Sequence, residues 1–202
     1  MARAILRVED AWVTAQSRVG LVPAVAAEAA HAAVDRVPLD EAALTDLAVA
    51  SEGGGNPVIP LLAAYRRAVE EEHGRPLGAV HAGLTSQDVM DTALALVVED
   101  VRGMLLEGLD RTGDALVRLV VRHGGTVMVG RTLTQHALPV SFGLKAASWL
   151  AGVDDAADDV AARAHLPVSF GGAAGSLAAT VARCAHPGDT EERTWQRVKE
   201  LL

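Results

Sequence analysis

The residues that could do chemistry first gather at positions 81–92, which read His-Ala-Gly-Leu-Thr-Ser-Gln-Asp-Val-Met-Asp-Thr. A loop containing glycine leads there into a long segment of regularly spaced apolar residues, so Thr85 and Ser86 fall at a helix start. Backbone N–H groups and hydroxyls at a helix start, with the imidazole of His81 beside them, suit a small carboxylate or phosphate. The same residues also suit a plain capped helix, because Asp88 would meet the positive end of the helix dipole.

A second group of reactive side chains lies at residues 130–139, Gly-Arg-Thr-Leu-Thr-Gln-His-Ala-Leu-Pro, between two long helical segments. Arg131 can hold a carboxylate through two parallel hydrogen bonds, and His136 can transfer a proton near neutral pH. Each has a structural alternative, since such an arginine can cap carbonyls and a histidine can hydrogen-bond across a bundle. A third segment, residues 167–176, reads Pro-Val-Ser-Phe-Gly-Gly-Ala-Ala-Gly-Ser and also falls between helices.

Together these three segments resemble the corresponding regions of the fumarase/aspartase superfamily. The matching patterns are His-x-Gly-x-Thr-Ser-x-Asp from His81, and Gly-Arg-Thr-x-x-Gln-x-Ala-x-Pro from Gly130, continued by Phe142-Gly143-x-Lys145. Within the superfamily the chain is most similar to the 3-carboxy-cis,cis-muconate cycloisomerases, and the resemblance covers nearly the whole chain. Three features carry this closer similarity: Gly-Asn-Pro-Val-Ile-Pro-Leu at 55–61, Trp-Leu-Ala-Gly at 149–152, and the loop at 170–176.

One position departs from many lyases of the superfamily. They carry histidine directly after Gly-Arg-Thr, where this chain has Leu133. An aliphatic side chain cannot transfer a proton, so the acid–base role of that histidine is not carried over to Leu133. Cycloisomerases of the family also lack histidine there, so the substitution disfavours an adenylosuccinate or argininosuccinate lyase more than a cycloisomerase.

The resemblance implies an enzyme that closes the carboxymuconolactone ring in protocatechuate degradation, the β-ketoadipate pathway. A substrate carboxylate adds to a conjugated double bond, and the negative charge that develops needs fixed cations, hydroxyls and one proton donor. The candidate catalytic residues are His136 and His81. The candidate substrate-binding residues are Asn56, Thr85, Ser86, Arg131, Thr132, Gln135 and Ser176. The resemblance further implies no metal ion or other cofactor, a small polycarboxylate substrate, and a homotetramer whose active sites are shared between subunits.

The length of the chain leaves functions other than a cycloisomerase open. The chain has 202 residues, roughly half of a family subunit, and it lacks the superfamily's signature loop Gly-Ser-Ser-x-Met-Pro-x-Lys-x-Asn-Pro. We expect a helical amino-terminal domain at 1–86, incomplete at its start, and the first part of a central long-helix bundle at 87–202, truncated before that loop. The alternatives to a cycloisomerase are a lyase that releases fumarate from adenylosuccinate or argininosuccinate, and a non-catalytic helical fragment.

Composition favours an all-α protein of the cytoplasm. Half of the residues are hydrophobic but only 3% are aromatic, and small aliphatic side chains suit close helix packing. A net charge of −8 disfavours nucleic acid as a partner, and without an apolar run of about 18 residues we expect no membrane span. The single cysteine, Cys184, fits a reducing compartment and a place in the core.

Hydrophobic spacing and capping residues predict helices throughout. The expected ranges are 2–18, 23–34, 40–51, 57–72, 87–122, 139–164, 173–185 and 190–202. An apolar stripe along the longest helix should face partner helices or subunits. It consists of Leu94, Val98, Val101, Leu105, Leu109, Thr112, Leu116 and Leu119. The acidic run at 154–159 is interpreted as a solvated face rather than a metal site.

Overall fold

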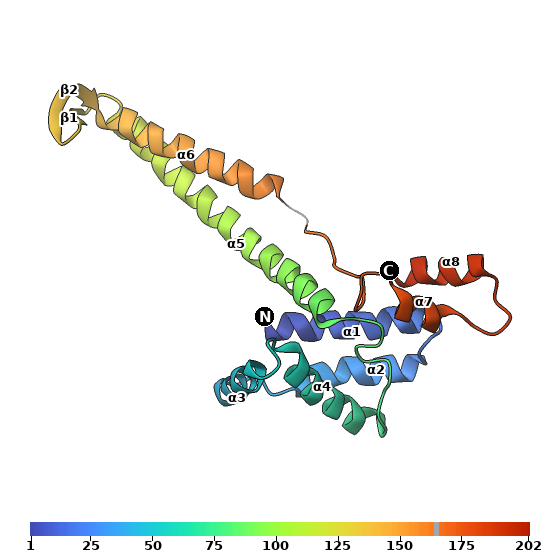
Figure 1. Cartoon of the computed structure of the whole chain (residues 1–202). Helices are drawn as coiled ribbons and strands as arrows, with labels where there is room; N and C mark the ends of the chain where they lie inside the picture. Colours follow the sequence, from blue (N-terminus) through green and yellow to red (C-terminus); the bar gives the residue numbers. More distant parts are fainter. Residues whose placement is uncertain (164–165) are drawn as a thin grey trace. The chain divides into compact units, whose positions relative to one another are not determined.

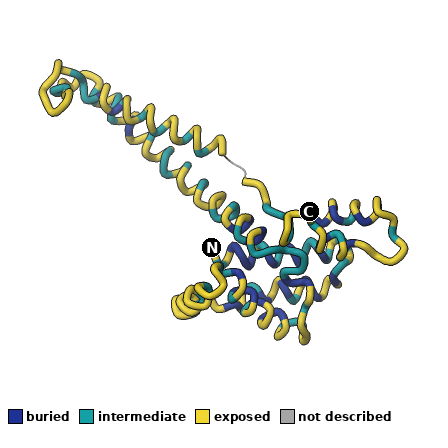
Figure 2. The backbone as a smooth tube through the Cα atoms, viewed as in Figure 1, coloured by how far each residue is buried: buried dark blue, intermediate teal, exposed yellow. Residues whose placement is uncertain are grey.

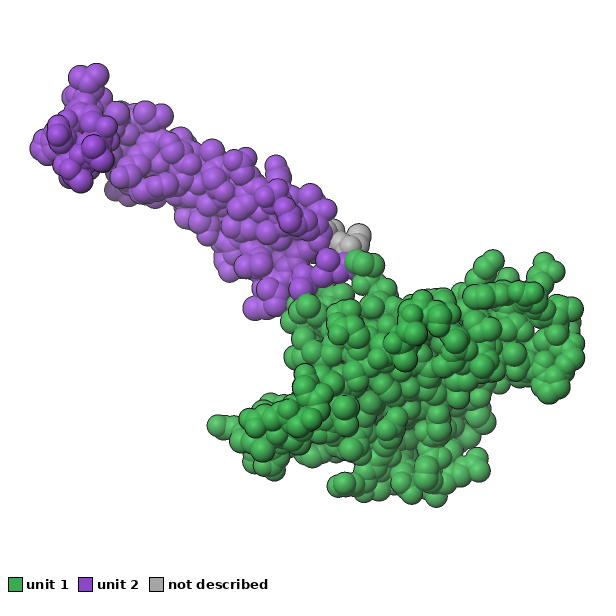
Figure 3. Space-filling model, in the orientation of Figure 1, with its two compact units in different colours: residues 1–97, 167–202 green, residues 98–166 purple. Residues whose placement is uncertain are grey.

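The computed structural model describes residues 1–163 and 166–202 and consists of helices, connecting loops and one β-hairpin (Figure 1). The chain forms two compact units, residues 1–97 with 167–202 and residues 98–166 (Figure 3). The two hairpin strands are the only strands within the described residues, so the predicted all-α class is confirmed.

The first unit is a group of helices around an apolar core. Its helices are α1 (Ala2–Arg18), α2 (Ala24–Ala33), the short 3-10 helix η1 (Val34–Arg36), α3 (Glu41–Glu52), α4 (Val58–His73), the first turns of α5 (Ser86–His123), α7 (Ala178–Cys184) and α8 (Glu191–Leu201). Helices α1, α2 and α4 bury one main cluster that includes Ile5, Val13 and Tyr65. Figure 2 shows that these helices carry many of the buried positions of the unit. A second cluster packs Trp12 of α1 against Cys184. Cys184 is fully buried, as predicted, and burial raises the pKa of its thiol.

Strong capping and breaking residues place most helix ends where the sequence predicts them. Helix α1 ends at Arg18 as expected, and Asp40 caps α3 by accepting a hydrogen bond from the N–H of Ala43 at 2.9 Å. Gly74 ends α4 with φ of 77°, a left-handed conformation that glycine adopts without strain. Helix α5 is one continuous helix of 38 residues, which confirms the prediction for residues 87–122.

Two helices begin later than predicted. Helix α7 starts at Ala178 rather than near residue 173, because Gly172, Gly175 and Leu177 all have positive φ and cannot continue a right-handed helix. Helix α6 (Phe142–Ala162) starts after the strand that contains Pro139. Its predicted end at residue 164 lies outside the described residues.

The second unit contains the rest of α5, the strands β1 (Val127–Thr132) and β2 (Gln135–Ser141), and α6. Helix α6 runs back beside α5 (Figure 1). A groove between the two helices is lined by residues that include Leu109, Gly113, Leu150 and Val153. At the hairpin end the ring of Phe142 meets His123 edge-on, with centroids 5.3 Å apart. The region between the long helices, expected to be a loop, is an antiparallel hairpin whose register shifts between Val129 and Arg131.

The apolar stripe predicted along α5 is largely uncovered within the chain. Leu94, Val98, Val101 and Leu105 are exposed, whereas Leu116 is buried. None of the described helices combines the length and the apolar character that crossing a bilayer requires.

Gly143, at the start of α6, cannot gain a side chain without moving backbone. A Cβ there would lie 2.7 Å from Cα of Gly124 and 2.9 Å from the carbonyl oxygen of His123. We expect Gly143→Ala to lower the free energy of unfolding by about 1–3 kcal/mol, the usual cost of overpacking. Gly152→Ala is the matched control in the same helix, because nothing lies within 4 Å of its Cβ position. It should stabilise by about 0.5–1 kcal/mol, and urea unfolding of both variants would test the contrast.

Candidate functional site

Two side chains of α1 fix the backbone of the His81 loop (residues 79–86), which leads into the first residue of α5. The indole Nε1 of Trp12 donates to the carbonyl of Ala82, and the amide Nε2 of Gln16 donates to the carbonyl of Ala79, both at 2.9 Å. Trp12 and Gln16 are four residues apart and so lie on one face of the helix. Gln16 is fully buried and also accepts a hydrogen bond from Arg183 of α7 at 2.7 Å. The His81 loop is therefore tied to α1 and, through Gln16, to α7.

The ring of His81 lies against a buried carboxylate. Its Nδ1 is 2.6 Å from Oε1 of Glu9, whose side chain is fully buried, whereas the His81 side chain is 16% exposed. His81 also has φ of 63°, a conformation that residues other than glycine rarely adopt. The structure thus places this predicted catalytic residue beside a buried charge and on strained backbone.

Asp88 joins the His81 loop to the glycine loop (residues 170–177). Its Oδ2 accepts hydrogen bonds from the N–H groups of Thr85 at 3.0 Å and Gly172 at 2.9 Å, and its Oδ1 accepts one from Gly171 at 2.9 Å. The Asp88 side chain is almost fully buried. Because charge-assisted hydrogen bonds are stronger than neutral ones, this carboxylate connects two loops that are far apart in the sequence through three strong hydrogen bonds.

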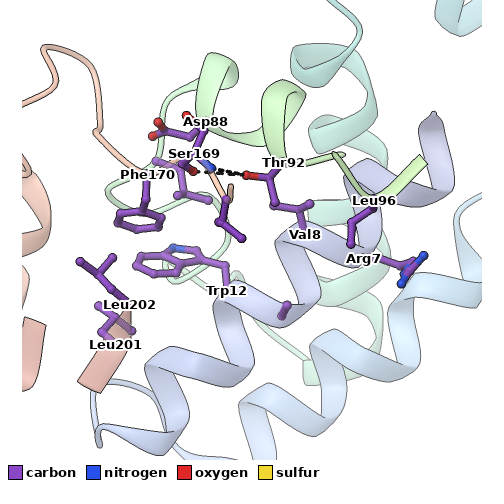
Figure 4. Close-up of a pocket in the computed structure, with 13 residues that line it drawn as sticks. Arg7, Val8, Trp12, Asp88, Thr92, Leu96, Ser169, Phe170, Leu201 and Leu202 are labelled. Carbon is purple, nitrogen blue, oxygen red and sulfur yellow. Dashed lines mark hydrogen bonds between the residues drawn. The ribbon is translucent and has the colours of Figure 1, made fainter. Parts of the chain in front are cut away.

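A second pair of hydrogen bonds supports this connection. The hydroxyl of Thr92 donates to the carbonyl of Ser169 at 3.2 Å and accepts from its N–H at 3.1 Å (Figure 4). Of the predicted substrate-binding residues nearby, Thr85 and Ser86 are half-buried and Ser176 is exposed. The structure therefore brings the loops that carry these three hydroxyls together within the first unit.

An apolar pocket of about 420 Å³ lies beside the same connection. The rings of Trp12 and Phe170 contact each other in its wall, with centroids 4.6 Å apart and planes tilted by 49°, and Leu201 and Leu202 also line it (Figure 4). Its lining is mainly apolar but includes Arg7, Asp88 and Thr92. None of the predicted substrate-binding or catalytic residues lines this pocket.

Asn56 has a local structural role. Its Oδ1 accepts from the N–H of Val58 at 3.0 Å, and its Nδ2 donates to the carbonyl of Gly54 at 3.2 Å. Both ends of the amide thus stabilise the turn that starts α4. Substrate binding by Asn56 stays a prediction.

The hairpin of the second unit brings the other four predicted site residues together. In its register Arg131 pairs with His136, and Thr132 pairs with Gln135. All four residues are exposed. Alternate residues of a strand point to opposite faces, so each pair presents its two side chains to one side of the hairpin. Arg131 and His136 therefore share one side, and Thr132 and Gln135 share the other.

The hairpin depends on unusual backbone at two places. Its two turn residues, Leu133 and Thr134, both have positive φ, 31° and 67°, although such turns favour Asn-Gly. Gly130 is required in β1, because a Cβ there would lie 2.5 Å from the carbonyl oxygen of Leu138. Leu133 itself is 91% exposed at the tip.

The sequence interpretation missed Glu9. Ile5, Trp12 and Val13 lie three or four residues from it on the buried face of α1, so a carboxylate at position 9 interrupts an apolar face. That interruption is the signal that could have identified it. Among residues 1–163 and 166–202, no group of histidine, cysteine or acidic side chains is arranged to hold a metal ion.

Comparison with known proteins identifies the relatives of this chain. The lyase family matches residues 2–198. Nitrosuccinate lyase from Streptomyces davaonensis is 45% identical over 187 residues, covering 92% of this chain and 39% of that protein. The 3-carboxy-cis,cis-muconate cycloisomerase of Bradyrhizobium diazoefficiens is 38% identical over 177 residues, covering 87% of this chain and 39% of that protein.

Solved structures agree with this relationship. The 3-carboxy-cis,cis-muconate lactonizing enzyme of Pseudomonas putida is similar over 99% of this chain and 44% of its own, with a TM-score of 0.79 and 32% identity. A fumarate lyase from Mesorhizobium sp. BNC1 has a TM-score of 0.75 and 33% identity, and the match covers 99% of this chain and 45% of that structure. The chain spans about two-fifths of the length of the curated relatives it matches.

Proposed function

Because this chain belongs to the lyase family of the fumarase/aspartase superfamily, we propose that its protein catalyses elimination or addition at a carbon–carbon double bond of a small polycarboxylate. The first candidate reaction is elimination from nitrosuccinate or a closely similar four-carbon dicarboxylate. The observation that carries this choice is the 45% identity to nitrosuccinate lyase over 92% of the chain. It modifies the expectation from sequence motifs, which favoured a cycloisomerase.

The elimination has a simple electron balance. A base removes a proton from the carbon next to the nitro-bearing carbon, the C–H electrons form the double bond, and the C–N bond breaks to release nitrite and fumarate. Negative charge develops on the carboxylate beside the deprotonated carbon, and fixed hydrogen-bond donors stabilise it. Arg131, Thr85 and Ser86 are the proposed donors, with His136 and His81 as the candidate proton-transfer residues. The exposure of Arg131 and His136 supports these roles, since both are accessible to a ligand.

Closure of the carboxymuconolactone ring is the second candidate. It is supported by 38% identity to a cycloisomerase and by the structural similarity to the P. putida enzyme. In this reaction a substrate carboxylate oxygen bonds to one carbon of a conjugated double bond and the neighbouring carbon takes a proton. An adenylosuccinate-type reaction is disfavoured, because the exposed Leu133 stands where many lyases have histidine.

We also propose that the protein is a cytoplasmic homotetramer whose subunits share each active site. Two observations support self-association: the exposed apolar stripe on α5, and the 38-residue helix that separates the His81 loop from the Arg131 hairpin along the chain. Sedimentation at micromolar concentration should show an oligomer. A compact monomer at that concentration would contradict this part of the proposal.

A parallel assay separates the candidate reactions. The purified protein would be incubated with nitrosuccinate, 3-carboxy-cis,cis-muconate or adenylosuccinate. We expect nitrite and fumarate in equal amounts from the first compound. Loss of carboxymuconate without fumarate release would instead establish the cycloisomerase. Absence of turnover with every substrate would refute the proposed enzyme and favour a non-catalytic helical protein.

A further inference from the structure

The buried carboxylate of Glu9 is bound on one side only. Its Oε1 meets Nδ1 of His81, and its fully enclosed Oε2 has no hydrogen-bond partner among the described residues. Removing an ionised carboxylate from water is costly unless its oxygens are paired, so an apolar residue here would serve stability better. The arrangement therefore indicates a function for Glu9 that involves its one bound partner, His81.

The surroundings hold this pair rigidly. Trp12 and Gln16 lie three and seven residues after Glu9 on the same face of α1, and they bind the carbonyls of Ala82 and Ala79 on either side of His81. The positive φ of His81 is an unfavourable backbone conformation, and the hydrogen bonds from Trp12 and Gln16 hold the loop in it. His81 thus combines an unfavourable backbone conformation with a contact to a buried carboxylate. This combination is expected where the orientation of a ring must be fixed accurately.

We propose that Glu9 is a positioning residue, which keeps a proton on Nδ1 of His81 and so leaves Nε2 free to meet the substrate. With Glu9 ionised, its oxygens only accept hydrogen bonds, and Nδ1 is then the donor in the 2.6 Å contact. Nε2 makes no hydrogen bond to other described residues, and the ring keeps 16% of its exposure. In this tautomer the neutral ring offers a lone pair at Nε2, which can take a proton from the substrate or, once protonated, hydrogen-bond a substrate carboxylate. That Nε2 meets substrate rests on the proposed function, whereas the tautomer does not.

Nitrogen-15 NMR of the chain labelled at histidine tests the tautomer without any turnover. The signals of His81 would be assigned by their loss in His81→Gln. In the wild type we expect neutral His81 to carry its proton on Nδ1. In Glu9→Met, which keeps the volume but removes the acceptor, we expect His81 to change to the Nε2-protonated form that imidazole prefers in water. Wild-type His81 in the Nε2-protonated form, or no change in Glu9→Met, would overturn the proposal.

Gln16→Met is the matched control, because Gln16 is equally buried on the same face of α1 and holds the same loop. It should destabilise the unit while leaving His81 protonated on Nδ1. An equal tautomer change in both variants would assign the effect to loop structure and refute a specific role for Glu9. Should Glu9→Met fail to fold, Glu9→Gln gives the second measurement. Its neutral amide should move the downfield Nδ1 proton resonance upfield or abolish it, and an unchanged resonance would refute the proposal.

The same variants distinguish this inference from the proposed reaction. In the active protein Glu9→Met should lower kcat at least about tenfold, as expected when the partner that orients a functional imidazole is lost. A confirmed tautomer in a protein without lyase or cycloisomerase activity would leave the positioning role intact and reject only the proposed reaction.

Discussion

Asp88→Ala is expected to lower the free energy of unfolding of the first unit by about 2–4 kcal/mol, the largest stability effect that we predict for a single side chain. The carboxylate accepts three backbone N–H groups, from Thr85, Gly171 and Gly172. Without it these donors lose their partner, and each buried unpaired donor costs about 1–3 kcal/mol, partly recovered where water can enter. Urea unfolding followed by circular dichroism would measure the change.

Asp91→Ala is the control for this prediction. Asp91 lies one turn further along α5, is exposed, and bonds only the Gln87 side chain among the interactions described for it. Its replacement should change stability by less than about 0.5 kcal/mol. Faster amide hydrogen exchange at Gly171 and Gly172 should accompany Asp88→Ala and be absent from Asp91→Ala. Equal stabilities of the two variants would show that Asp88 does not join the loops.

The long helix was predictable from sequence, whereas the hairpin was not. Helix α5 follows from apolar residues at steps of three and four over about seven turns, and it is bounded by Thr85 and by glycines 124 and 125. The hairpin has none of the usual local signals, because its turn is Leu133-Thr134 and its second strand contains Pro139. Its pairing and the close approach of Gly130 to Leu138 are contacts between residues of two different strands, and local sequence preferences do not reveal such contacts.

For the candidate site, residue types identified the loops but not what holds them. The hydroxyls, Arg131 and the imidazoles were recognisable because their chemistry and spacing are local. The contacts that position them are not local: Glu9 and His81 are 72 residues apart, and Asp88 and Gly171 are 83 residues apart. Asp88 was interpreted as a helix-dipole partner, which its position in the first turn permits, but its main partners come from the other loop. Periodicity shows that a polar residue is on a buried face and does not show which distant atom it meets.

Arg131→Ala is expected to reduce kcat/KM by roughly 30- to 4000-fold, which corresponds to about 2–5 kcal/mol for the loss of a charged partner from a bound carboxylate. The stability of the chain should hardly change, because Arg131 is exposed in the hairpin. Steady-state kinetics with the substrate identified by the parallel assay would measure the effect. Both KM and kcat should deteriorate if the guanidinium binds the carboxylate in the ground state and more strongly as charge develops.

Arg122→Ala is the matched control, since it removes an equally exposed arginine from the last turn of α5 without touching the hairpin. It should leave kcat/KM within about twofold of the wild type, because exposed charges at a distance are screened by salt.

His136→Gln provides the contrast within the hairpin, where the imidazole is paired in register with Arg131. If His136 transfers a proton, its replacement should lower kcat while KM stays near the wild-type value, unlike the combined effect at Arg131. Wild-type kinetics in Arg131→Ala would remove the hairpin from the site, and wild-type kinetics in His136→Gln alone would leave His136 as a structural residue beside a binding arginine.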